Sequence, residues 1–199
     1  MQRWLCLLAG GMVLFGCATQ RQATWGMVGG KQLIGSGQIE LELPPGWMRY
    51  TPADSDPVIT QDGVLLLLTR DGFGLQSIRV SKRPVGADLP YTKKKLSTGM
   101  PPQELAEVTF DNIRSNPNIL NPETIENSPA KIGEVSGFKL VYAYQTKDGL
   151  RKQGIYYGCI VKDSFYSLVY EAPKRHYFTL EVTTFERIEA SFKWIQTPS

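Results

Sequence analysis

The segment Phe138-Lys-Leu-Val-Tyr-Ala-Tyr-Gln-Thr-Lys-Asp-Gly149 decides the fold class. Apolar and aromatic residues recur at every second position of its first half, which is typical of a β-strand with one buried face. The Asp148-Gly149 pair that follows predicts a tight turn. The alternation returns in 155–161, and a second turn at Asp163-Ser164 leads into 165–172. The sequence therefore predicts a three-strand antiparallel meander.

Further strands are expected before the meander. Alternation in 38–43 and 75–83 predicts two half-buried strands. The run Val64-Leu-Leu-Leu-Leu68 is typical of a central strand covered on both faces, and the preceding Asp62-Gly63 predicts a hairpin with 57–61. The segment 124–132 is expected at a sheet edge because it contains Pro129, which cannot donate a ladder hydrogen bond.

Two helices complete the expected fold. Pro101-Pro102 opens the first, because proline is tolerated in the first turn of a helix, and Asn116-Pro117 ends it. After Pro173, apolar residues at helical spacing predict a terminal helix, although the β-branched residues of 179–185 favour a strand as the competing interpretation. The sequence thus predicts an α+β domain, with an antiparallel sheet of about six to eight strands packed by at least two helices.

Three segments of this pattern resemble proteins with the PsbP/Mog1-like fold. They are the opening Ile39-Glu-Leu-Glu-Leu-Pro-Pro-Gly-Trp47, the strand Gly137-Phe-Lys-Leu-Val-Tyr142 and the closing Phe185-x-x-Ile-x-x-Ser-Phe192. The likeness covers roughly residues 38–195 and implies an antiparallel sheet with helices on its faces. It carries no catalytic residues over, because members of this fold act mainly as binding or assembly factors.

The first twenty residues are typical of a secretory signal. Arg3 precedes an apolar run of about 14 residues, which is shorter than the ~20 that a spanning helix needs. The run ends on Leu14-Phe-Gly-Cys17, which resembles the lipobox of bacterial lipoproteins. The resemblance implies cleavage between Gly16 and Cys17 and a diacylglycerol on the Cys17 sulfur, usually with a further acyl chain such as palmitate. By the same resemblance, Ala18 after this cysteine favours the periplasmic side of the outer membrane, with the outer face of the cytoplasmic membrane as the alternative.

The expected organisation has three parts. Residues 1–16 form the cleaved signal peptide, residues 17–37 carry the lipid and a flexible tether rich in Gly, Gln, Thr and Ser, and residues 38–199 form a single globular domain. Trp25, Met27 and Val28 suggest a second interpretation of the tether, in which these side chains enter the bilayer interface beside the anchor.

Composition and cysteine content exclude several classes of protein. A net charge of +3 over 199 residues is too small for a nucleic-acid-binding protein, which usually carries a concentrated basic face. Removal of Cys6 with the signal and lipidation of Cys17 leave Cys159 as the one free thiol, so no internal disulfide can form. Because Cys159 lies in an alternating apolar strand, we expect it to be buried and inert.

No catalytic or metal motif stands out in the sequence. His176 is the single histidine, and its basic surroundings are more typical of a solvated helix start than of a catalytic base. One histidine and one free cysteine cannot supply a tetrahedral zinc site, and no glycine-rich loop has the form of a phosphate cradle. We therefore expect no cofactor and a non-enzymatic protein.

A concentration of tyrosines is the strongest hint of a binding surface. Tyrosine combines apolar area with a polar tip, which suits interfaces; the alternative is cross-strand packing under the helices. The candidate partner surface consists of Tyr142, Tyr144, Tyr156, Tyr157, Tyr166 and Tyr170. The expected function is a lipid-anchored module that binds an envelope protein or a cell-wall partner. An envelope hydrolase with a site assembled in space and a carrier or chaperone of apolar ligands remain the alternatives.

Overall fold

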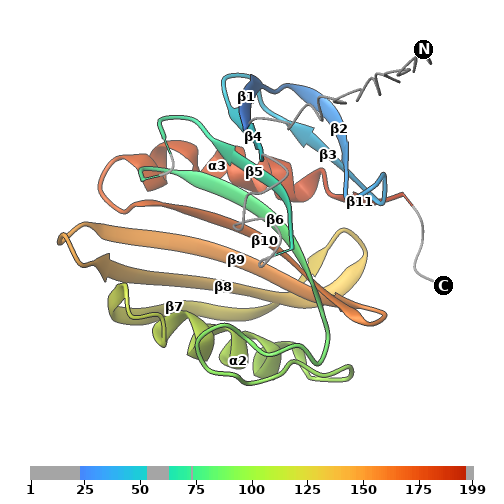
Figure 1. Ribbon diagram of the computed structural model, residues 1–199, viewed down its shortest axis with the longest axis vertical. Coiled ribbons are helices and arrows are strands. Elements are labelled where there is room, and N and C mark those ends of the chain that lie inside the picture. The colour runs from blue at the N-terminus through green and yellow to red at the C-terminus, as the bar shows by residue number, and fades with distance from the viewer. Residues whose placement is uncertain (1–22, 53–62, 73, 196–199) are drawn as a thin grey trace, which may run out of the picture.

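The structure is a computed structural model that describes residues 23–52, 63–72 and 74–195. Its main element is an eight-stranded antiparallel sheet (Figure 1). In spatial order the strands are β1 (Thr24–Met27), β4 (Met48–Thr51), β5 (Val64–Thr69), β6 (Ser77–Pro84), β10 (Ser164–Pro173), β9 (Arg151–Val161), β8 (Val135–Thr146) and β7 (Ile119–Ile132). A smaller sheet has the order β11 (Lys193–Trp194), β3 (Ile39–Leu43) and β2 (Gly30–Ile34).

Two helices, α2 (Pro102–Arg114) and α3 (Tyr177–Ala190), pack against the sheet. Figure 1 shows α2 beneath β7 and β8, at the end of the molecule opposite to β1 and β4. The prediction of an α+β domain with a three-strand meander, here β8, β9 and β10, is confirmed. The competing strand over 179–185 is wrong, because these residues form part of α3.

The large sheet has a buried core on each face. Successive side chains of a strand point to opposite faces, so β9 sends Ile155, Tyr157 and Cys159 to one side and Tyr156 to the other. The first face packs against α3 and the small sheet, around the fully buried Trp47. The second face packs against α2 through a smaller cluster: Leu89, Leu96, Leu105, Ala106, Phe138, Leu140, Tyr142 and Phe165.

Two glycines in β9 allow large rings to lie flat on the second face. Phe138 is paired with Gly158, and Tyr142 is paired with Gly154. A Cβ atom at Gly158 would lie 2.5 Å from Cε1 of Phe138, and one at Gly154 would lie 2.5 Å from Cζ of Tyr142. Such distances are shorter than any non-bonded contact between carbon atoms. Each ring therefore occupies the space that a side chain on β9 would fill.

An ion pair connects the first face to α3. Glu181 is 3% exposed, and its carboxylate accepts a hydrogen bond from the Arg70 guanidinium at the end of β5. A charged group is buried at tolerable cost only when it is paired and hydrogen-bonded. The pair therefore fixes where α3 lies against the edge of the core.

The tether expected over 17–37 is wrong for part of its length. Residues 24–27 form β1, which pairs with β4, and residues 30–34 form β2, which pairs with β3. Strand pairing overrides the loop-like local composition. Gly35 and Gly37, both with positive φ, lie in the turn between β2 and β3.

Two other expectations also bear on strand boundaries. The expected partner strand over 57–61 lies outside the described residues. The edge strand expected from residue 124 begins earlier, at Ile119. It pairs with β8, with register shifts between Leu120 and Glu123 and between Thr124 and Glu126, and Pro129 is paired within it.

We predict that Gly158→Ala lowers the free energy of unfolding by about 1–3 kcal/mol, the usual cost of overpacking a core. The added methyl group would displace the Phe138 ring, and Cε2 of Phe165 also lies within 2.9 Å of the Cβ position. Denaturant titration followed by circular dichroism measures the change. Gly74→Ala is the control, because no neighbouring heavy atom lies within 4 Å of its Cβ position; equal stability of the two variants would contradict the packing described here.

The core position of Cys159 gives a second prediction. The residue is fully buried, and burial raises the pKa of its thiol to about 12. The unfolded chain loses the thiol proton at a pKa of about 8.5, whereas the folded chain keeps it to a higher pH. The contribution of this group to the free energy of unfolding is therefore complete below pH ~8.5 and is lost as the pH rises towards 12. Iodoacetamide at pH 8 should leave Cys159 unmodified in the folded chain and alkylate it completely in guanidinium, as peptide mapping would show. Rapid alkylation of the folded chain would contradict this burial.

Candidate functional site

A cavity of about 580 Å³ lies on the second face of the sheet, between the strands, α2 and the loop 86–99. Its floor is formed by side chains of β6, β8, β9 and β10 that share this face: Arg79, Ser81, Arg83, Tyr142, Tyr144, Thr146, Tyr156, Phe165, Ser167 and Glu171. Its wall and rim come from the loop, α2 and the chain that follows it: Leu89, Pro90, Tyr91, Thr109, Asn112, Ile113, Asn116, Asn118 and Ile119.

Strand register places one row of residues at the centre of the floor. Gly154 of β9 is paired with Tyr142 of β8 on one side and with Glu171 of β10 on the other. Because Gly154 has no side chain, the Tyr142 ring crosses β9 and its hydroxyl donates to Oε1 of Glu171 at 2.8 Å. The hydroxyl of Tyr144 donates to the same oxygen at 3.1 Å. One carboxylate oxygen thus receives two phenolic donors, and the two rings stack with centroids 6.1 Å apart.

The protonation state of these phenols follows from their surroundings. Burial raises the pKa of Tyr142 and of Tyr144, and the negative charge of Glu171 raises both further, whereas the nearby Arg79 acts in the opposite direction. The phenols therefore stay protonated at physiological pH and keep their donor protons on the carboxylate. Hydrogen bonds to an ionised acceptor are stronger than neutral ones, so this cluster is a rigid part of the floor.

A second polar group lies along β6 and β10. The hydroxyls of Ser81 and Ser167 are 2.7 Å apart. Burial raises the pKa of Tyr156, while a hydrogen bond with Ser167 and the positive charges of Arg79 and Arg83 oppose that shift. Both guanidinium groups therefore act on the same phenol, and the cavity floor combines arginine, serine, tyrosine and glutamate side chains with the apolar ring of Phe165.

Side-chain contacts hold the loop 86–99 against α2. The backbone N–H of Tyr91 donates to Oδ1 of Asn112 at 2.9 Å, and the ammonium of Lys94 pairs with the carboxylate of Asp111. Leu89 and Leu96 are buried beneath the loop. The wall of the cavity is thus anchored by both polar and apolar contacts, and Tyr91, which is 47% exposed, stands at its rim.

The six tyrosines proposed as one partner surface lie on both faces of the sheet, so that proposal needs correction. Tyr142, Tyr144 and Tyr156 line the cavity. The other three, Tyr157, Tyr166 and Tyr170, are buried in the opposite core, where their rings contact Phe185, Trp194 and Phe178, respectively. Odd and even positions of one strand cannot share a face, and half of the proposed set is therefore packing.

Several cavity residues were missed by the sequence analysis. Glu171 and Ser167 lie on β10, Arg79 on β6 and Asn112 on α2, so no local motif joins all four. One signal was available: Glu171 is the single charged residue in the run 165–172, and acidic residues are rarely buried without partners. The alternation that predicted the strands also determines which residues lie on the same face of the sheet as Glu171.

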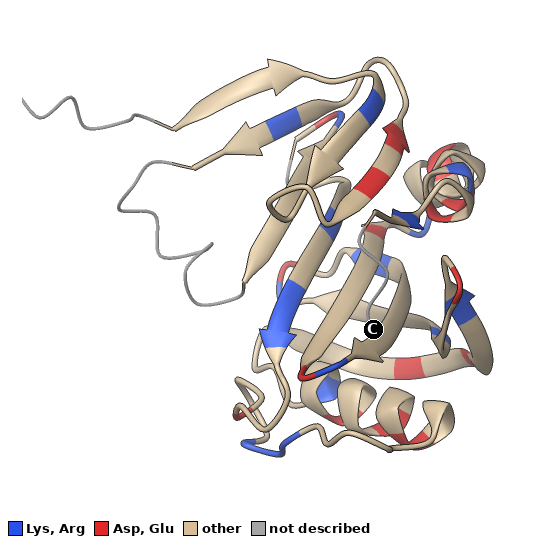
Figure 2. Cartoon of the chain, turned by 90° about the vertical axis from the view of Figure 1, so that its right-hand side faces the viewer, with Lys and Arg blue, Asp and Glu red and all other residues tan. Residues whose placement is uncertain are grey.

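The remaining candidates lie elsewhere. His176 is exposed at the start of α3 with a φ of 83°, and α3 packs on the opposite face of the sheet from the cavity. Cys17 and Gly16 lie outside the described residues. Figure 2 shows basic and acidic segments interspersed over loops, strands and helices. In the ranges 23–52, 63–72 and 74–195, no helix has the length and apolar character to cross a membrane, and no three potential metal-ligating acidic, histidine or cysteine side chains cluster.

Comparison of the sequence with protein-family models and with curated proteins finds no match. Solved structures do match. The cyanobacterial PsbP protein of Synechocystis (CyanoP) shares 12% identity at a TM-score of 0.56, covering 93% of this chain and 98% of its own. The Ran-binding protein Mog1p of Saccharomyces cerevisiae shares 12% identity at a TM-score of 0.48, covering 86% and 98%. LpqN of Mycobacterium tuberculosis, described as involved in cell envelope biogenesis, shares 13% identity at a TM-score of 0.45, covering 87% and 91%.

These identities show the fold alone, and of the three structures the PsbP protein matches this chain with the highest TM-score. The meander and both helices were predicted from the sequence pattern, and the structural match covers nearly the whole chain. The chain has the PsbP/Mog1-like fold.

Proposed function

We propose that this chain is a cell-envelope lipoprotein, anchored through Cys17, whose domain binds an envelope protein or a cell-wall partner without catalysing a reaction. The lipobox-like sequence supports the anchor, and two or three acyl chains on one cysteine provide the multiple lipid contacts that stable anchoring needs. Ala18 favours the periplasmic side of the outer membrane, and the outer face of the cytoplasmic membrane is the alternative location.

The cavity is the observation that carries the binding role. Its volume of about 580 Å³ falls within the usual range for ligand sites, which combine apolar walls with a few fixed polar groups. Here the fixed groups are Glu171, held by Tyr142 and Tyr144, and the Ser81–Ser167 pair. Groups that are already positioned lose little conformational entropy on binding, which favours recognition of a side chain or sugar unit from a partner.

The same geometry gives less support to the two alternatives. A carrier of apolar ligands would present mainly aliphatic walls, whereas this floor carries Arg79, Arg83 and Glu171. A hydrolase built on His176 would need that imidazole beside the cavity, but His176 begins the helix that packs on the opposite face. A thiol nucleophile at Cys159 would have to ionise, and burial raises its pKa to about 12.

Site-specific photocrosslinking tests the binding role. We predict that a photoreactive phenylalanine analogue replacing Tyr91, at the cavity rim, yields a discrete adduct in cells or in solubilised envelopes. The same analogue replacing Leu180, which is 56% exposed on α3, is the matched control and should yield no such adduct. Glu171→Ala should reduce the Tyr91 adduct, because it removes the acceptor that positions two tyrosines.

Equal labelling from the two positions, combined with turnover of an envelope substrate by the purified protein, would contradict the proposal. Loss of the adduct in Glu171→Ala is informative only if that variant folds. Its far-UV circular dichroism and thermal midpoint therefore need to be measured alongside the crosslinking.

A further inference from the structure

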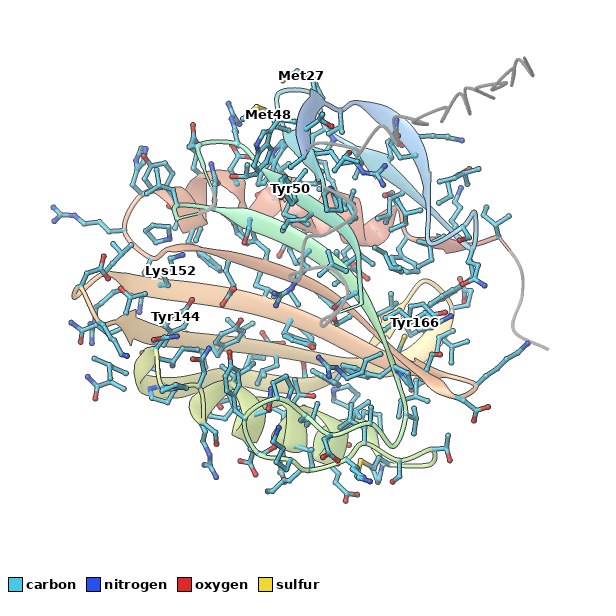
Figure 3. All side chains as sticks on the ribbon, in the orientation of Figure 1. Met27, Met48, Tyr50, Tyr144, Lys152 and Tyr166 are labelled. Carbon is cyan, nitrogen blue, oxygen red and sulfur yellow. The ribbon has the colours of Figure 1, made fainter. Side chains whose placement is uncertain are left out.

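An apolar patch covers one face of the two strands at the free edge of the large sheet. Trp25 is paired with Tyr50, and Met27 is paired with Met48, so register places all four side chains on the same face of the β1–β4 ribbon. Figure 3 shows Met27, Met48 and Tyr50 together at this end of the molecule. Met27 is 70% exposed and Trp25 is 45% exposed. We call these four residues the edge patch.

The edge patch is held in place by the framework around it. The rings of Trp25 and Tyr50 contact each other with centroids 4.9 Å apart. The N–H of Val28, just after β1, donates to the carbonyl of Trp47 at 3.0 Å, and the Trp47 side chain is fully buried in the core. Exposure of these aromatic and methionine side chains is therefore a fixed property of the folded domain.

The position of the edge patch in the chain indicates what covers it. Trp25 is the eighth residue after Cys17, and a fully extended chain spans at most about 3.5 Å per residue. A lipid on Cys17 would therefore keep Trp25 within ~28 Å of the membrane surface at all times. Tryptophan and tyrosine are enriched at membrane–water interfaces, because each combines an apolar ring with a polar group.

We propose that the edge patch inserts into the interface of the bilayer that holds the lipidated Cys17. This inference rests on the proposed lipid anchor, and it adds a second membrane contact that orients the domain. Because the chain between Cys17 and Trp25 is short, the lipid anchor gives the edge patch a high local concentration at the membrane, and a weak contact is then sufficient.

This contact determines how far the cavity stands from the membrane. The sheet order places β4, β5 and β6 between the β1 edge and the strands β10, β9 and β8 that form most of the cavity floor. Neighbouring strands lie about 4.8 Å apart, so β9 is five spacings, or about 24 Å, from β1. With β1 and β4 at the membrane, the cavity and α2 would stand in the aqueous compartment, accessible to a partner.

Tryptophan quenching by brominated phospholipids tests the insertion directly. The mature, lipidated full-length chain is reconstituted in phosphatidylcholine vesicles with bromine at a shallow acyl position. The emission of Trp25 is measured as the difference in fluorescence between the wild type and Trp25→Phe. We predict that the brominated lipid reduces the wild-type emission by this amount. Trp194→Phe should retain the loss, because Trp194 packs against Tyr166 and Phe192 in the small sheet.

A charge substitution provides the matched pair of variants. Met27→Asp should abolish the quenching, whereas Leu33→Asp should preserve it, because Leu33 is also exposed, at 58%, but lies on β2 of the other sheet. Unquenched Trp25 in a chain that co-floats with the vesicles would overturn the insertion alone. Cys17→Ser should carry no lipid and should not co-float with the vesicles. If the wild-type chain behaves in the same way, the proposed anchor is wrong. Capture of a protein on the edge patch, with Trp25 unquenched, would also overturn the inference.

Discussion

The contact between Tyr142 and Glu171 across Gly154 connects the fold of this protein to its cavity. The phenol reaches the carboxylate 2.8 Å away only because the strand between them has no side chain at that position. The same arrangement recurs four residues along β9, where Phe138 covers Gly158. Two small residues in one strand therefore determine how the aromatic residues of β8 lie, and these in turn form the floor on which α2 and the loop 86–99 close.

The two faces of the sheet consequently have different roles. The face under α3 and the small sheet is a dense apolar core, with Glu181 paired to Arg70 at its margin. The face under α2 is only partly filled, and the remaining space is lined by groups that hydrogen-bond to one another. Buried polar networks of this kind are costly unless every member is satisfied. A satisfied polar network beside a cavity is expected of a recognition site. The difference between a densely packed face and a face with a polar cavity is the physical basis of the proposed binding role.

The sequence predicted the regular elements that depend on local pattern. Alternation located β8, β9 and β10, and helical spacing located α3, because burial of one face imposes these periods. It missed β1 and β2, whose glycine-rich composition resembles a tether and whose stability comes from pairing with β4 and β3. It also missed the cavity, since Glu171, Arg79 and Asn112 meet only through long-range pairing. The grouping of six tyrosines failed for a simpler reason, namely that alternation separates Tyr156 from Tyr157.

The hydroxyl protons of the tyrosines provide the most direct test of this account. In proton NMR spectra of the folded chain, the hydroxyl resonances of Tyr142 and Tyr144 should be resolved and exchange slowly with water, because both protons are held by the Glu171 carboxylate. The exposed Tyr91 serves as the reference for a hydroxyl in fast exchange. Gly154→Ala should abolish the slow exchange of Tyr142, since the added methyl group would occupy the position of its ring. Exchange of Tyr142 as fast as that of Tyr91 in the wild-type chain would contradict the central contact.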